Sequence, residues 1–165
     1  DVELALTGPG TESGTYDSFI ELALADIAEE RGVPEDQLES TRSDYDASPD
    51  DNVIISNIES SDTSLGWVGF AFAESAGDSI KELGVSETPD GECVEPSAET
   101  IADGSYPLSR TLYIYVNTDK AEENTAVSGF VDFYLDGLSG FVEDTGYVAL
   151  PDDAAAETTS LWEGR

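Results

Sequence analysis

Histidine is absent from the 165-residue sequence, and cysteine occurs once, as Cys93. A lone cysteine cannot form a disulfide within the chain. Zinc sites are built from histidines or from several cysteines, and the Ser-His-Asp triad needs a histidine base. These absences therefore exclude zinc-dependent enzymes and histidine-based serine hydrolases.

Long apolar runs are also missing. No stretch approaches the roughly 18 uninterrupted apolar residues of a membrane-spanning helix. The first residues do not show the basic start and apolar run of a signal peptide. With 39% hydrophobic residues, a chain of this length buries one ordinary core but not two. We expect one compact water-soluble domain, without a targeting segment.

Basic residues are scarce, since 6 Lys and Arg against 37 Asp and Glu give a formal net charge of -31. Such a domain repels itself at moderate salt, whereas in molar salt the Debye length falls to about 3 Å and the repulsion is screened. The acidic residues are interleaved with apolar ones, which is typical of a solvated surface rather than a disordered tail. The composition predicts a halophilic protein that binds neither nucleic acid nor an anionic membrane.

The spacing of apolar residues predicts alternating strands and helices. Strands are expected at residues 2–6, 65–73, 111–116 and 147–150. Helices are expected from about Gly14 to Arg31 and at residues 53–58, 79–85, 97–104 and 126–146, before a polar tail that is helical or frayed. This alternation predicts an α/β layered sheet with flanking helices. Aromatic residues along these elements are expected in the core rather than at a ligand: Tyr16, Phe19, Trp67, Phe70, Tyr113 and Tyr115.

Small and polar residues crowd the expected start of the first helix. The first amides of a helix lack intrahelical partners, and the helix dipole places a partial positive charge there. If Ser13, Gly14 and Thr15 open the helix, their amides point outward, both hydroxyls can donate, and Gly14 exposes bare backbone to a ligand. Ordinary capping by serine and threonine accounts for the same residues. The preceding turn, residues 8–10, lacks the endings of a P-loop or a dinucleotide fingerprint.

An acid-rich loop at residues 44–52 offers oxygen donors to a metal ion. Counted from its first aspartate, the positions of the glycine and the glutamate of a calcium loop hold Pro49 and Ile55. We therefore predict no metal site and no cofactor. Residues 50–52 are expected to cap the helix at 53–58.

Four segments occur in the order found in one protein family: GPGTESGTYDSF at 8–19, SDYDASPDDNVII at 43–55, PSAETIADGSYPLSRTLYIYVN at 96–117 and GYVALPD at 146–152. The chain thereby resembles the phosphate-binding proteins of high-affinity phosphate ABC transporters, in a haloarchaeal form. The resemblance implies a lobe like those of type II periplasmic binding proteins. It also implies an extracellular protein at the cell surface that delivers inorganic phosphate to a membrane permease.

In that family the Ser-Gly-Thr turn binds phosphate, which implies Ser13, Gly14 and Thr15 as ligands here. Many members also place an arginine four residues before the serine and an aspartate two residues before it. Those positions hold Pro9 and Thr11, so the usual guanidinium is missing.

Another arginine is expected to replace that guanidinium, because a bidentate donor suits phosphate. Arg42, in the loop after the first helix, is the candidate, with an exposed ion pair to Asp44 or Asp46 as the alternative. Arg110 ranks below it. Arg31 is interpreted as a partner of the helix dipole.

Family members have two lobes that enclose phosphate, and this chain resembles their carboxy-terminal part. We expect one α/β unit over residues 1–165 with a hinge crossing near 104–112, and a first lobe that is missing or belongs to a partner chain. Two alternatives remain. A phosphatase-like enzyme would use Ser13 as nucleophile, although no histidine is present as its base, and a stand-alone lobe would serve association only.

Overall fold

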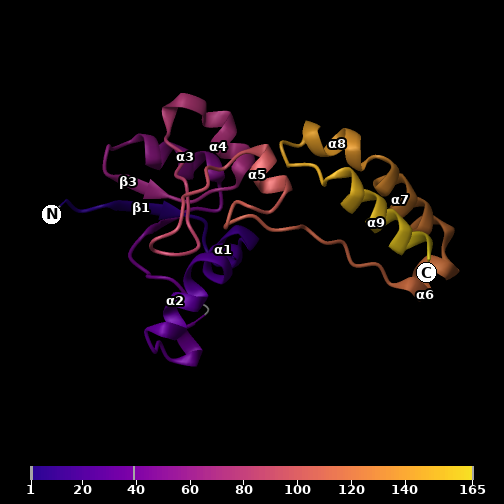
Figure 1. Ribbon diagram of the computed structural model, residues 1–165, viewed down its shortest axis with the longest axis horizontal. Coiled ribbons are helices and arrows are strands. Elements are labelled where there is room, and N and C mark those ends of the chain that lie inside the picture. Colours follow the sequence, from indigo (N-terminus) through magenta and orange to yellow (C-terminus); the bar gives the residue numbers. More distant parts are fainter. Residues whose placement is uncertain (1, 39, 165) are drawn as a thin grey trace. The chain divides into compact units, whose positions relative to one another are not determined.

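The computed structural model describes residues 2–38 and 40–164 (Figure 1). They fall into two compact units: the first runs up to Pro96 and includes Tyr106–Leu108, and the second holds Ser97–Ser105 and the chain from Ser109 onward. Two of the crossings between the units lie within the predicted hinge stretch at 104–112. The single α/β unit with one hinge stays a prediction.

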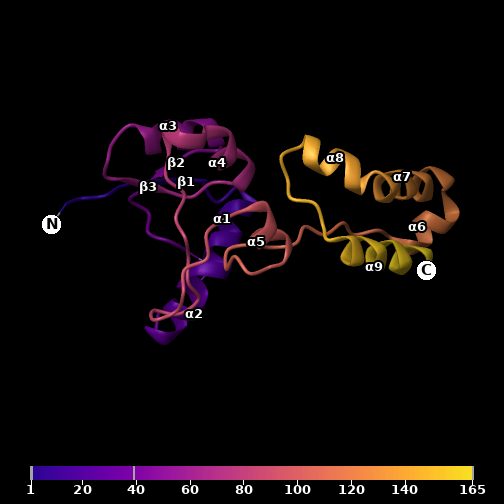
Figure 2. The same ribbon diagram turned by 45° about the horizontal axis from the view of Figure 1, so that its top comes forward.

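The first unit is built on a three-stranded parallel sheet in the order β2-β1-β3. The central strand β1 (Ala5–Gly8) pairs with β2 (Asp46–Ala47) and with β3 (Ser64–Gly66). Helix α3 (Asp51–Glu59) lies on one side of the sheet and α1 (Gly14–Phe19) on the other, as Figures 1 and 2 show. This arrangement confirms the predicted α/β class.

The predicted first helix is confirmed as a continuous run. It comprises α1, a π-helical segment at Ile20–Leu24 and α2 (Ala25–Glu30). It ends where the sequence predicts, because Gly32 adopts a φ of +69°, the left-handed conformation that glycine tolerates best. The run buries Tyr16 and Ile20, and α3 buries Ile54 completely.

The helix expected at residues 53–58 is also confirmed, as α3. Its N-cap is Asp50, whose carboxylate accepts a hydrogen bond of 2.9 Å from the amide of Asn52. This cap satisfies one of the amides that the helix start would otherwise leave without a partner.

The prediction of a strand at residues 65–73 is wrong beyond Gly66. The chain leaves the sheet there and forms α4 (Phe70–Ala76). A short continuous apolar run suits a buried strand and a helix segment equally, so the apolar pattern could not decide between them. The helix expected at 79–85 is wrong as well, because the segment is irregular after a 3-10 turn at Gly77–Ser79.

The second unit is helical. It contains α5 (Ala98–Ala102), α6 (Thr118–Glu123), α7 (Thr125–Asp136), α8 (Leu138–Asp144) and α9 (Asp152–Glu163). The helix predicted at 126–146 is thus two helices separated at Gly137. The tail, which was expected to be helical or frayed, is helical. The indole N–H of Trp162 on α9 donates to Asp132 on α7 at 2.6 Å. None of the described helices is both long and apolar enough to cross a membrane.

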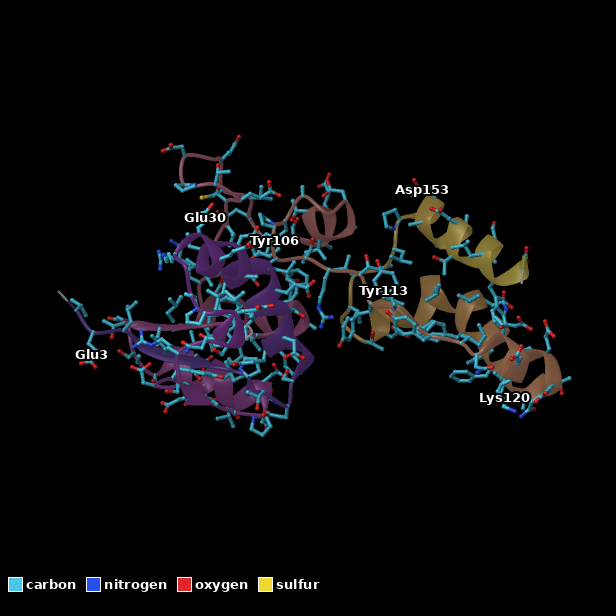
Figure 3. All side chains as sticks on the ribbon, turned by 90° about the horizontal axis from the view of Figure 1, so that it is seen from below. Glu3, Glu30, Tyr106, Tyr113, Lys120 and Asp153 are labelled. Atoms are coloured by element: carbon cyan, nitrogen blue, oxygen red, sulfur yellow. The ribbon has the colours of Figure 1, made fainter. Side chains whose placement is uncertain are left out.

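The strands predicted at 111–116 and 147–150 are wrong, since neither segment joins a β-ladder with any described residue. β-propensity reflects packing against neighbouring strands, and here no neighbour is in place. Tyr113 and Tyr115 are 74% and 93% exposed, which corrects their assignment to the core. Figure 3 labels Tyr113 on the segment that leads to α6.

The acidic side chains that the structure describes are exposed or half-buried. No aspartate or glutamate whose side chain the structure describes is buried. Glu3, Glu30 and Asp153, labelled in Figure 3, are exposed.

Candidate functional site

The carboxyl edge of the sheet gathers the starts of three helices. Strands β1, β2 and β3 run parallel and end at Gly8, Ala47 and Gly66, and the next long element after each is α1, α3 or α4. Ligands of open α/β sheets bind outside the carboxyl ends of the strands. Helix N-termini at such an edge add partial positive charge without any basic side chain.

Helix α1 starts at the predicted residues. Ser13 is its N-cap, with φ -109° and ψ 130°, and its hydroxyl oxygen accepts from the amide of Thr15 at 3.2 Å. The amide of Ser13 itself donates to the carbonyl of Gly10 at 3.0 Å. The expectation that these amides lack partners is therefore wrong for Ser13 and Thr15, because the turn and the cap already occupy them.

The capped helix start is still accessible from the surface. Gly14 is exposed and Ser13 and Thr15 are half-buried, so a small ion can reach them. A serine hydroxyl that accepts one hydrogen bond keeps its own proton to donate. An anion that displaces the Ser13 hydroxyl from the Thr15 amide would exchange a neutral hydrogen bond at the long end of its range for a charge-assisted one, which is roughly twice as strong.

Arg42 forms an ion pair with Asp44, which was the alternative to its predicted role as a phosphate ligand. Its Nε and Nη2 donate to the two carboxylate oxygens at 2.5 and 2.6 Å, and the two side chains are 59% and 67% exposed. The hydrogen bond and the charge of Asp44 raise the pKa of Arg42, and the hydrogen bond from Arg42 lowers the pKa of Asp44. An exposed pair stabilises little. The role of Arg42 as a phosphate ligand stays a prediction.

Polar residues that the sequence analysis did not single out hold the sheet edge together. Thr7, 2% exposed, donates to the carbonyl of Asp46 at 3.0 Å and accepts from the side chain of Asn57 at 3.2 Å. The amide of Ser48, 8% exposed, donates to the carbonyl of Gly8 at 3.0 Å. The sequence signal for these residues is a polar residue at the end of an apolar run. That signal does not distinguish a buried polar residue from an exposed one.

A family profile described as "PBP superfamily domain" matches residues 4–137. The chain belongs to the PBP superfamily. The matched PBP region includes the sheet, the start of α1 and the chain as far as the end of α7.

Named PBP-like relatives match nearly the whole chain. Protein SphX of Synechocystis is 37% identical over 155 residues, which are 93% of this chain and 42% of that protein. The phosphate-binding protein PstS of Staphylococcus saprophyticus is 34% identical over 160 residues, 96% of this chain and 45% of the relative. The chain thus spans less than half the length of these two relatives.

Solved structures share the same fold. A "possible phosphate binding protein" from Planctomyces limnophilus superposes with a TM-score of 0.74 at 32% identity, covering 98% of this chain and 53% of the other. PstS of Borrelia burgdorferi superposes with a TM-score of 0.60 at 21% identity, over 92% of this chain and 55% of the other. At that identity the second match speaks for the fold alone.

Proposed function

We propose that the chain binds inorganic phosphate and delivers it to an ABC permease. The observation that carries this proposal is the start of α1, where Ser13, Gly14 and Thr15 lie accessible at the carboxyl edge of a parallel sheet. The names of the relatives support the choice of ligand, since the staphylococcal protein is a phosphate-binding protein.

Neutral donors hold the phosphate in this proposal. The hydroxyls of Ser13 and Thr15 donate to its oxygens, and the Thr15 amide joins them once the anion displaces the Ser13 hydroxyl from it. The helix dipole favours the anion. A glycine at position 14 lets the ion approach the backbone closely. These uncharged donors suit a chain with 6 basic residues and a net charge of -31.

Arg42 is proposed as the additional charged ligand. Its carboxylate partner lies two positions away in the same loop, and both side chains are exposed. Rotation of Arg42 from Asp44 to phosphate would replace one bidentate anion with another. The exchange therefore costs few hydrogen bonds.

We infer that the chain is the carboxy-terminal portion of a two-lobed protein. Leu112 and Ile114 are 60% and 50% exposed, and Phe130 and Phe133 of α7 are 66% and 65% exposed. Soluble monomers rarely leave large apolar patches uncovered. A first lobe that covers these residues would remove them from water, and the length of the relatives leaves room for such a lobe.

The proposed setting is extracellular, at the surface of a haloarchaeal cell. The acidic composition supports the high-salt environment. We infer a binder rather than an enzyme, because a serine nucleophile needs a base and the sequence holds no histidine.

Calorimetric titration with phosphate and with sulfate in molar KCl tests this proposal, next to a turnover assay with a chromogenic phosphate ester. Binding heat with phosphate and no turnover is expected. Turnover would favour the phosphatase-like alternative. If phosphate neither releases heat nor raises the melting temperature, the proposal fails and the association-only alternative gains.

A further inference from the structure

The turn between β1 and α1 is held by aromatic residues from outside it. An added Cβ at Gly8 would lie 2.6 Å from two carbons of the Trp67 indole, so that ring packs directly on the end of β1. The same indole stacks on Phe19, near the end of α1, with ring centroids 4.5 Å apart and planes at 16°. Trp67 thus contacts both elements that the turn connects.

Tyr45 holds the next residue of the turn. Its hydroxyl donates to the carbonyl of Pro9 at 2.7 Å. Its ring lies against Trp67 at a centroid distance of 5.1 Å and an angle of 41°. Burial, and then the charges of Tyr16 and Glu12, raise the pKa of Tyr45, so the hydroxyl keeps the proton that it donates.

The third residue of the turn, Gly10, reaches the site itself. Its carbonyl accepts from the amide of Ser13, the N-cap of α1. Gly8, Pro9 and Gly10 are thereby held by Trp67, Tyr45 and Ser13 in sequence.

The position of Trp67 over Gly8 leaves its indole N–H without a hydrogen bond to any described residue. Nε1 of Trp67 is buried and finds no acceptor among the described residues. Removing such a donor from water without a partner costs free energy. A phenylalanine would avoid that cost but would place a smaller ring over Gly8.

We propose that Trp67 and Tyr45 are positioning residues of the anion site, which fix the turn at residues 8–10 and with it the orientation of Ser13. This inference rests on the proposed phosphate binding for its ligand, but not for its geometry. Neither aromatic residue touches the phosphate in this account. Their effect on binding passes through the turn.

Tyr45→Phe tests the proposal, because it removes one hydroxyl and keeps the ring. Tyr16→Phe is the matched control: the hydroxyl of Tyr16 accepts from the amide of Thr41 at 3.4 Å, outside the turn at residues 8–10, although its ring is buried next to the site. The dissociation constant for phosphate, in molar KCl, should rise about three- to tenfold in Tyr45→Phe and stay unchanged in Tyr16→Phe.

Amide hydrogen exchange at Ser13 gives a readout that needs no phosphate. Exchange should accelerate about three- to tenfold in Tyr45→Phe and not in Tyr16→Phe. If the wild-type chain binds no phosphate but exchange at Ser13 accelerates in Tyr45→Phe, the proposed function fails and the positioning role stands. If neither affinity nor exchange separates the two variants, the positioning role is overturned.

Fluorescence provides a second measurement if Tyr45→Phe does not fold. The sequence has 2 tryptophans, so Trp162→Phe leaves Trp67 as the single indole. Phosphate should change the emission of this variant, because the turn and the ring move together. Binding heat without any change in emission would overturn the role of Trp67.

Discussion

Replacing Ser13 separates its role as a helix cap from its proposed role as a ligand. Ser13→Ala removes both. Loss of an N-cap costs about 0.5–2 kcal/mol of stability. The bond from the Thr15 amide to the Ser13 hydroxyl, at 3.2 Å, lies at the long end of its range, so we expect about 0.5–1 kcal/mol. For a chain of this size that lowers the melting temperature by about 1–4 °C.

Ser13→Asp keeps the helix cap and removes only the serine hydroxyl that is proposed to bind phosphate. Aspartate caps as well as serine, and its charge suits the positive end of the helix dipole, so the melting temperature should hold or rise. A carboxylate about 4 Å from a phosphate charge repels it by about 4 kcal/mol at an effective dielectric constant of 20. Even if molar salt screens two thirds of this repulsion, phosphate binding weakens about tenfold.

Asn124→Ala is the matched control for both variants. Asn124 caps α7 by accepting from the amide of Ala126 at 3.0 Å, and it has no part in the proposed site. Its loss should lower the melting temperature as Ser13→Ala does and leave the affinity measured by calorimetry unchanged. Wild-type affinity in Ser13→Asp, or an equal loss of affinity in Asn124→Ala, would refute the reasoning.

Dialysis from molar KCl into low salt should unfold the chain as its repulsion becomes unscreened; full retention of near-UV circular dichroism would contradict this. Burial, and then the charges of Glu74 and Glu95, raise the pKa of Glu82, so stability falls as pH rises from the ordinary glutamate pKa to the raised one. Glu82→Gln should flatten this dependence of the melting temperature on pH and raise the melting temperature at pH 7 by about 1–2 °C. A melting temperature below that of the wild type at pH 7 would contradict this prediction. Asp50→Ala should lower stability by about 1 kcal/mol through loss of the α3 cap, and Asp50→Asn should restore most of it.

Local chemistry made several elements predictable. The starts of α1 and α3 follow from Ser13 and Asp50, whose side chains accept from amides two positions ahead. The end of the first helical run follows from Gly32 and its positive φ. In each case the deciding contact lies within a few residues, so the sequence pattern contains it.

Features that depend on distant partners were not predictable. The segment at 111–116 has the composition of a strand, yet a strand forms only beside another strand, and none pairs with it among the described residues. The run at 65–73 changes from strand to helix after Gly66, a choice that its apolar pattern leaves open.

Only part of the candidate site could be read from the sequence. The position of Ser13, Gly14 and Thr15 at a helix start was predicted. The sequence did not predict the hydrogen bond from the Ser13 amide to Gly10, because it depends on the geometry of the turn. It did not decide which aspartate pairs with Arg42 either, because that depends on side-chain geometry. The sequence offered Asp44 and Asp46 equally as neighbouring partners of Arg42.

The most direct test of the account is the amide spectrum of the helix start. Proton and nitrogen shifts of Ser13, Gly14 and Thr15 can be followed by NMR as phosphate is added in molar KCl. The account predicts that these shifts move the most and saturate with the calorimetric dissociation constant. Saturable binding that leaves all three amides unchanged would contradict it.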